Sequence, residues 1–142
     1  MIIFDFTMLD GDTSKLVKII SQNEYAYPDI LRITGEFRIL INGNIFFSEP
    51  YFPILEFLKY ALAWINCSDK SKAMLYSSAE TDDNPLIIFD KNEEGWIIRS
   101  PWQKYECLVG FTRDEVIHAI LHLLETLVSR NTERQGDGTP VS

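Results

Sequence analysis

His118 and His122 are the two histidines of the chain, and Glu125 follows them at helical spacing. Positions i, i+4 and i+7 lie on one face of a helix, where two imidazoles and a carboxylate can share a metal ion. Position 119 is alanine, so the HExxH motif with its general-base glutamate is absent. We therefore interpret these residues, together with Ala119, as the solvent-facing side of a helix.

Other catalytic signatures are also missing from the sequence. No serine lies in a GxSxG elbow, neither cysteine is flanked by glycines, and no glycine-rich phosphate loop is present. Cys67 and Cys107 are too few and too far apart for a disulfide framework or a cysteine zinc site. We expect a protein that is not an enzyme and that needs no cofactor.

Acidic side chains are concentrated between positions 80 and 94. This segment holds six carboxylates and one lysine, which together carry −5 of the formal net charge of −8. Adjacent acids on a loop rarely bind a divalent cation alone, and their spacing does not match a calcium-binding loop. They either keep the loops solvated or attract a basic partner protein. The six carboxylates are Glu80, Asp82, Asp83, Asp90, Glu93 and Glu94.

Four aromatic residues, Tyr76, Trp96, Trp102 and Tyr105, lie near these acids in the sequence. Aromatic side chains are enriched at binding hot spots, although in small sheets most of them belong to the core. Trp102 follows Pro101 at a predicted strand end, which makes it the best candidate for exposure. The predicted partner-binding set therefore consists of the six carboxylates and Trp102.

The composition narrows the classes of partner. The chain has 13 lysines and arginines against 21 aspartates and glutamates, and nucleic-acid or anionic-lipid surfaces require a basic face. The longest apolar segment, residues 53–67, contains Glu56 and Lys59 and is too short to span a bilayer. The N-terminus has no basic leader. We expect a cytoplasmic protein that binds another protein and neither nucleic acid nor membrane.

The first half of the chain carries two clear strand patterns. Residues 2–8 alternate in the manner of a half-buried strand. Residues 31–48 predict a β-hairpin, because Asn42 and Gly43 separate two alternating apolar runs and both tolerate a positive φ. Residues 13–21 fit a short helix or a strand equally, so this alternative stays open.

Two helices are predicted. Residues 53–67 are apolar on nearly all sides, which is typical of a central core helix. A second helix begins at Thr112, since Thr112 and Glu115 have the spacing of a capping box. The first helix leaves only a narrow polar strip, formed by Glu56, Lys59 and Tyr60.

Four short apolar runs between residues 73 and 111 predict three or four antiparallel strands. The fold class is therefore α+β, with two main helices packed on one face of an antiparallel sheet made of the hairpin and this meander. We expect residues 1–130 to form a single domain. Residues 131–142 lack apolar content and are expected to form a flexible tail. The acids before and after the run at residues 86–89 are expected at opposite ends of the sheet.

The segment ITGEFRILINGNIFFSEPYFPILEFLKYALAW, with the later IIFD and GWIIRSPWQ runs, resembles uncharacterised bacterial domains. It is also similar to the small acidic immunity proteins that accompany secreted polymorphic toxins. The resemblance covers roughly residues 31–128 and rests on structural motifs, so no functional residue is transferred from it. It implies a stoichiometric binder of a partner protein, such as a basic nuclease toxin.

Two further functions fit the sequence. The first is a small metal-dependent hydrolase centred on His118, His122 and Glu125, which requires other acids or histidines to converge on that helix face. The second is a module whose exposed sheet edge pairs with a second copy of the chain, which light scattering would detect. The oligomeric state itself is not indicated by any pattern.

Overall fold

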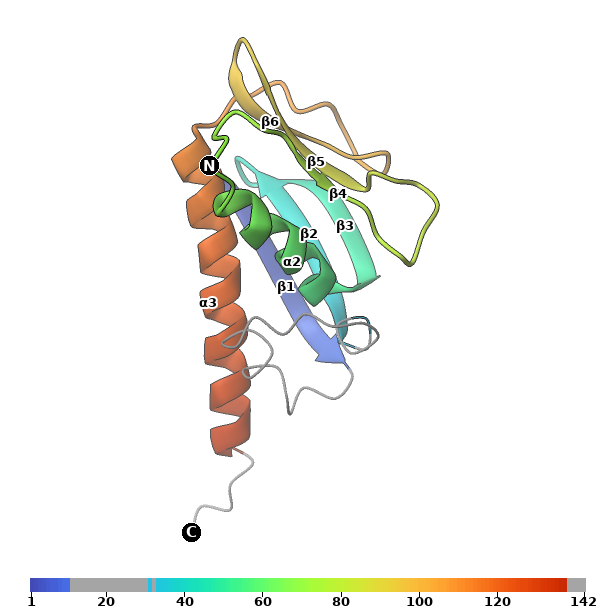
Figure 1. Ribbon diagram of the computed structural model, residues 1–142. Helices are drawn as coiled ribbons and strands as arrows, with labels where there is room; N and C mark the ends of the chain where they lie inside the picture. The colour runs from blue at the N-terminus through green and yellow to red at the C-terminus, as the bar shows by residue number, and fades with distance from the viewer. Residues whose placement is uncertain (11–30, 32, 138–142) are drawn as a thin grey trace.

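The computed structural model describes residues 1–10, 31 and 33–137 (Figure 1). The segment at residues 13–21, predicted as a helix or a strand, lies outside the described residues. In chain order the elements are β1 (Ile2–Asp10), β2 (Thr34–Ile41), β3 (Asn44–Phe52), α2 (Ile54–Ile65), β4 (Met74–Tyr76), β5 (Ile87–Asn92), β6 (Gly95–Arg99) and α3 (Arg113–Asp137).

The described strands form two antiparallel sheets of three strands each, in the orders β1-β2-β3 and β4-β5-β6. This arrangement confirms the α+β class and the antiparallel pairing. The hairpin and the meander lie in separate sheets and are not joined into one. In Figure 1, α2 lies against the first sheet and α3 runs along β1.

The hairpin between β2 and β3 is confirmed, and its turn explains why it forms. Asn42 has a φ of 50° and Gly43 a φ of 86°, the positive values that a two-residue turn between twisted strands requires. The turn sets the register, because Ile41 then pairs with Asn44. One face of β2 consequently points into the core with Phe37 and Ile39 fully buried.

Helix α2 is the central helix that its apolar pattern predicts. Pro53 precedes its first residue, where no backbone N–H partner is needed. Its polar strip differs from the prediction, because Glu56 is fully buried while Lys59 is exposed and Tyr60 half-buried. The second sheet covers the face of α2 that carries Glu56, and nothing in the local sequence indicates this contact.

Phe57 of α2 connects the two sheets. Its ring contacts Phe4, Phe37 and Phe52 of the first sheet at centroid distances of 5.8, 5.4 and 5.9 Å. It also contacts Tyr76 and Phe89 of the second sheet at 5.5 and 6.3 Å. All five distances lie within the range of favourable aromatic pairs. One side chain therefore packs against strands β1 to β5.

The meander contains three strands, and its fourth predicted run forms no further strand. Residues 105–111 make an isolated bridge in which Phe111 pairs with Trp96. Gly110 lies so close to the β5–β6 turn that a Cβ atom would collide with the carbonyl oxygen of Glu94. The run packs against the turn by a close backbone approach that glycine permits.

The segment after β6 crosses the free edge of β3. The backbone N–H of Lys104 donates to the carbonyl of Phe46 at 2.8 Å, and the hydroxyl of Tyr105 donates to the carbonyl of Asn44 at 3.0 Å. Burial, and then the nearby Cys107, raise the pKa of Tyr105 above its ordinary value. These bonds tie the second sheet to the first.

Helix α3 begins with the predicted capping box. The side chain of Glu115 accepts from the N–H of Thr112, and the N–H of Glu115 donates to the Thr112 hydroxyl, both at 3.1 Å. Ala119 is buried, so its predicted exposure is wrong, because the helix packs this side against β1. The helix continues to Asp137 and includes residues 131–137, predicted as a tail; residues 138–142 lie outside the described part.

Arg113 and Arg130 attach α3 to its neighbours. The Arg113 guanidinium lies 4.8 Å from the ring centroid of Trp64 and donates to the carbonyls of Trp64 and Ile65 at the end of α2. Arg130 lies 4.9 Å from the ring centroid of Phe6 and donates to the Phe6 carbonyl at 2.9 Å. Both contacts combine a cation–π interaction with a hydrogen bond to the backbone.

In the described part of the chain, no helix is long and apolar enough to cross a membrane.

Replacing Phe57 by alanine should lower the free energy of unfolding by about 3–5 kcal/mol, since the cavity would remove packing from both sheets. Urea denaturation followed by circular dichroism would measure the change. Leu108→Ala is the control, because this side chain is 75% exposed, and we expect a change within about 0.5 kcal/mol. A loss below about 1 kcal/mol for Phe57→Ala would show that the sheets are held together by other contacts.

Candidate protein-binding surface

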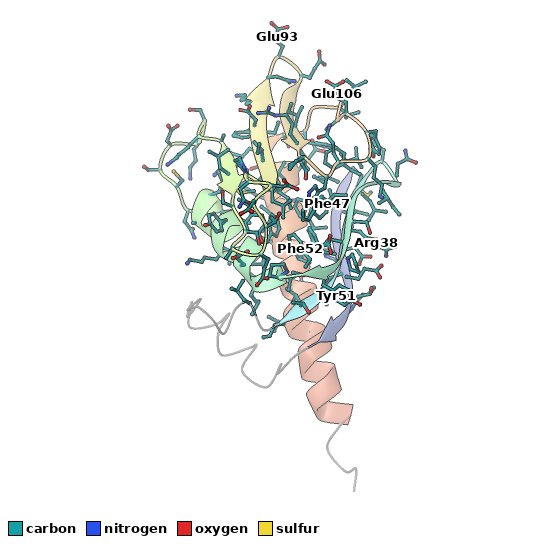
Figure 2. All side chains as sticks on the ribbon, turned by 90° about the vertical axis from the view of Figure 1, so that its right-hand side faces the viewer. Arg38, Phe47, Tyr51, Phe52, Glu93 and Glu106 are labelled. Atoms are coloured by element: carbon teal, nitrogen blue, oxygen red, sulfur yellow. The ribbon has the colours of Figure 1, made fainter. Side chains whose placement is uncertain are left out.

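The structure separates the six predicted carboxylates into two groups, as expected. Residues 80–83 lie in the loop between β4 and β5, which precedes the first residue of β5. Glu93 and Glu94 form the turn after its last residue, and Figure 2 shows Glu93 at the tip of that hairpin. Asp90 is already paired with Arg99 at 2.7 Å on the surface. The two groups therefore lie at opposite ends of β5.

Asn84 holds the β4–β5 loop in a defined shape. Its side-chain carbonyl accepts from the N–H of Ser78 at 2.9 Å, and its amide group donates to the carbonyls of Ser78 and Thr81 at 2.9 and 2.7 Å. The hydroxyl of Ser78, a buried residue, accepts from the N–H of Glu80 at 3.1 Å. A loop with this many internal bonds presents Glu80 from a fixed backbone position.

Glu56 anchors the same loop from inside the protein. One carboxylate oxygen accepts from the Tyr76 hydroxyl at 2.6 Å, and the other from the N–H of Ala79 at 3.1 Å. Burying a carboxylate is costly unless hydrogen bonds replace its hydration. These bonds supply that replacement and fix the start of the loop to α2.

Trp102 lies beside the first group of carboxylates. Its indole N–H donates to Asp83 at 2.8 Å, and its ring stacks on Phe47 with an interplanar angle of 13° and centroids 6.3 Å apart. The residue is half-buried, which makes it less exposed than the sequence suggests. The stacking on a buried strand residue explains the difference. Tyr76 and Trp96, by contrast, belong to the core.

A pocket of about 230 Å³ opens next to Trp102. It lies where the end of β3, the start of α2 and the β4–β5 loop meet. Tyr51, on its rim, is 76% exposed, the largest fraction among the large hydrophobic side chains that the structure describes. The lining residues are Glu49, Tyr51, Phe52, Pro53, Ser78, Glu80, Thr81, Leu86 and Trp102.

We call the acidic and aromatic part of this region the aromatic-acidic surface, which comprises Glu49, Tyr51, Glu80, Asp83 and Trp102. Three of the five were predicted from the sequence. Glu49 and Tyr51 were missed, because they lie on β3 and approach the loop only in the folded chain. The available signal was the pattern SEPYF, in which Pro50 marks an edge strand whose outer side chains can be exposed.

The predicted metal face is located on α3. His118, His122 and Glu125 are exposed there, and the two histidines line a groove of about 580 Å³ against β1, together with Met1 and Ile3. Within the described residues, no group of three or more histidine, cysteine, aspartate or glutamate side chains could hold a metal ion. The convergence of ligands that a metal-dependent hydrolase requires on this face is therefore not observed among them.

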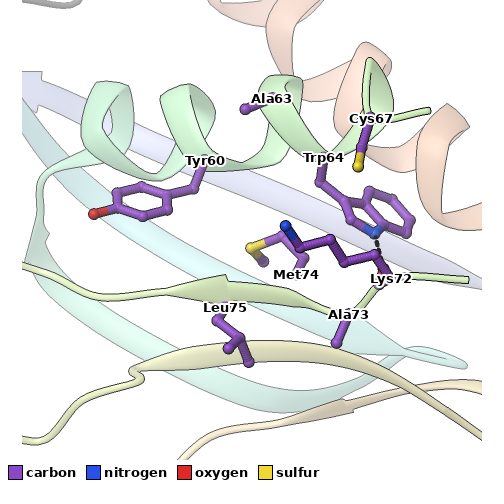
Figure 3. A pocket seen from close by; sticks show the side chains of 8 residues that line it. All are labelled: Tyr60, Ala63, Trp64, Cys67, Lys72, Ala73, Met74 and Leu75. Carbon is purple, nitrogen blue, oxygen red and sulfur yellow. Dashed lines mark hydrogen bonds between the residues drawn. The ribbon is translucent and has the colours of Figure 1, made fainter. Parts of the chain in front are cut away.

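A smaller pocket of about 160 Å³ lies between the end of α2 and β4 (Figure 3). The Trp64 indole N–H points across it and donates to the carbonyl of Lys72 at 2.7 Å. Its other lining residues include Tyr60, Cys67 and Leu75. This bond fixes the loop that follows α2, so we assign the polar group in this pocket a structural role.

Comparison with known proteins gives one match. A family model described as a domain of unknown function, DUF7878, matches residues 3–130. No curated protein and no solved structure matches the chain. The matched residues include both sheets, both described helices except the end of α3, and the whole aromatic-acidic surface.

Replacing Tyr76 by phenylalanine should cost about 1–3 kcal/mol, because the change removes a hydrogen-bond donor from the buried carboxylate of Glu56. The free energy of unfolding would be measured in urea, and hydrogen exchange of the Ala79 amide would report on the loop. Tyr60→Phe is the matched control, since Tyr60 packs on the Tyr76 ring but is only half-buried. Equal effects of the two substitutions would contradict the anchoring role of Glu56.

Proposed function

The chain belongs to the DUF7878 family, and we propose that it is a non-enzymatic protein-binding domain of the immunity type. In this proposal the cytoplasmic protein neutralises a basic partner, such as a toxin, by covering part of its surface. The resemblance to small acidic immunity proteins favours this function. The family match leaves the function open, and the aromatic-acidic surface supplies the structural support.

The observation that carries the proposal is the bond between Trp102 and Asp83. It holds the aromatic ring of Trp102, from the segment after β6, beside a carboxylate of the β4–β5 loop. Asn84 and Glu56 already order that loop. A surface that is ordered before binding loses less conformational entropy in the complex. Aromatic side chains in such a setting typically supply much of the affinity of a protein interface.

The net charge of −8 fits a basic partner. Carboxylates steer an oppositely charged protein toward the surface and raise the association rate more than the affinity. Glu93 and Glu94 lie about 20 Å from the loop, the length of a six-residue strand. In this proposal they attract the partner, while the aromatic-acidic surface makes the contact.

Affinity capture of the tagged protein from a lysate of its host, followed by washes at low and high salt, tests the proposal. Mass spectrometry should identify one basic protein at a stoichiometric amount. The purified partner is then titrated by calorimetry, and its toxicity is measured with and without the domain. A partner that is acidic, or a complex that leaves the partner's activity unchanged, would contradict the proposal.

Replacing Tyr51 by alanine should weaken binding of this partner by at least about 1 kcal/mol, roughly a fivefold increase in Kd, because an exposed aromatic anchor is lost. The effect should lie mainly in the dissociation rate. Leu108→Ala is the matched control, since the two side chains are 76% and 75% exposed. Equal Kd values for both variants would place the interface elsewhere on the molecule.

Reversing Glu93 or Glu94 to lysine should slow association roughly two- to fivefold at low salt, as steering in total raises association rates about 10- to 1,000-fold. The salt dependence of the association rate should become weaker, with little change in the dissociation rate. Stopped-flow fluorescence would measure both rates. Glu125→Lys changes the charge equally on α3 and serves as control. Unchanged kinetics would remove the β5–β6 turn from the approach of the partner.

A further inference from the structure

We propose that the pocket beside Trp102 is a subsite for an arginine side chain of the partner protein. This inference deepens the proposed function, because it rests on a protein partner and names the group that enters the surface. The pocket should also bind small guanidinium compounds, and this binding can be tested before any partner is known.

The size of the pocket favours a single side chain. Its volume of about 230 Å³ is below the roughly 300–1,000 Å³ that is usual for sites of drug-sized ligands and cofactors. Its floor includes three buried apolar residues, Phe52, Pro53 and Leu86, while the rest of its lining is polar or aromatic. Such a floor suits the methylene groups of a long side chain whose charged end stays near the rim.

The charges around the pocket specify a cation. Glu49 and Glu80 line it from two different elements, and no lysine, arginine or histidine is among its lining residues in the described part of the chain. Other described carboxylates, Asp5 and Asp90, already pair with arginines of the chain at 2.6 and 2.7 Å. Neither Glu49 nor Glu80 forms such a pair with a described residue. The guanidinium of a partner arginine would form an ion pair with each of these two carboxylates.

The aromatic groups favour arginine over lysine. A planar guanidinium stacks on tryptophan and tyrosine and bonds two carboxylate oxygens at once, whereas an ammonium group acts as a point charge. Trp102 and Tyr51 line the pocket, and Asp83 holds the Trp102 indole through its N–H. Within the chain, Arg113 and Arg130 make the cation–π part of this contact, at 4.8 and 4.9 Å from aromatic ring centroids.

Glu49 and Glu80 are held by separate hydrogen bonds. The side chain of Glu49 accepts from the N–H of Tyr51 at 3.4 Å, which holds it near the pocket rim. The backbone of Glu80 is held by its bond to the Ser78 hydroxyl. The two acids therefore face the same opening without depending on each other, so each should contribute separately to the binding of a guanidinium.

A titration with N-acetyl-L-arginine amide tests the subsite. Two-dimensional ¹⁵N NMR of the full chain would follow the Trp102 indole signal, assigned with the Trp102→Phe variant. We expect saturable shifts at millimolar concentration for the arginine amide. The matched probe is N-acetyl-L-citrulline amide, which has the same shape without the charge, and it should produce no saturable shift.

Three variants give the residue assignment. Glu49→Gln and Glu80→Gln should each weaken binding of the arginine amide about two- to fivefold, the range of a solvent-exposed ion pair. Glu125→Gln changes the charge equally at an exposed position on α3, outside the pocket lining, and should leave the Kd unchanged. No shift with the arginine amide, equal shifts with the citrulline amide, or equal effects of all three variants would overturn the subsite.

The outcomes also separate the subsite from the proposed function. If the arginine amide binds as expected and capture yields no partner, the subsite is supported and the protein-binding function is the part that fails. If a partner binds and its Kd is unchanged by Glu49→Gln and Glu80→Gln, the subsite is overturned and the binding function stands.

Discussion

The packing of Phe57 between the two sheets is the contact on which the rest of the structure depends. Backbone hydrogen bonds join the strands within each sheet, while the sheets meet chiefly through aromatic rings gathered around α2. Two of the rings that touch Phe57 are Phe52, the last residue of β3, and Tyr76, the last residue of β4. The same contact that joins the sheets therefore sets the distance between the end of β3 and the β4–β5 loop. The aromatic-acidic surface lies across that gap.

Glu56, adjacent to Phe57 on α2, connects the same helix to the loop through polar bonds. Apolar packing alone fixes the distance between elements, but several conformations of a loop backbone remain accessible. The bonds of the buried carboxylate to Tyr76 and Ala79 select one conformation. A single turn of α2 thus provides both the packing and the hydrogen bonding that the proposed binding surface requires.

The features that could be predicted from sequence are those with a local cause. Asn42 and Gly43 determine the hairpin turn, and Thr112 and Glu115 the start of α3, because in each case the interacting groups are a few residues apart. The burial of Glu56, the half-buried state of Trp102 and the separation into two sheets depend on contacts between distant segments, which leave no periodic signal. For the same reason the sequence could suggest Glu80, Asp83 and Trp102, which lie after β4, but could not associate Glu49 and Tyr51 on β3 with them.

The bonds from Lys104 and Tyr105 to β3 have a further consequence, for solubility. An uncovered edge strand offers its free backbone groups to any other extended chain, which is a common route to aggregation. Here the segment after β6 occupies part of that edge, so the protein uses its own backbone as a cap. Loss of this cap would expose a template for intermolecular strand pairing even in a chain whose core was otherwise intact.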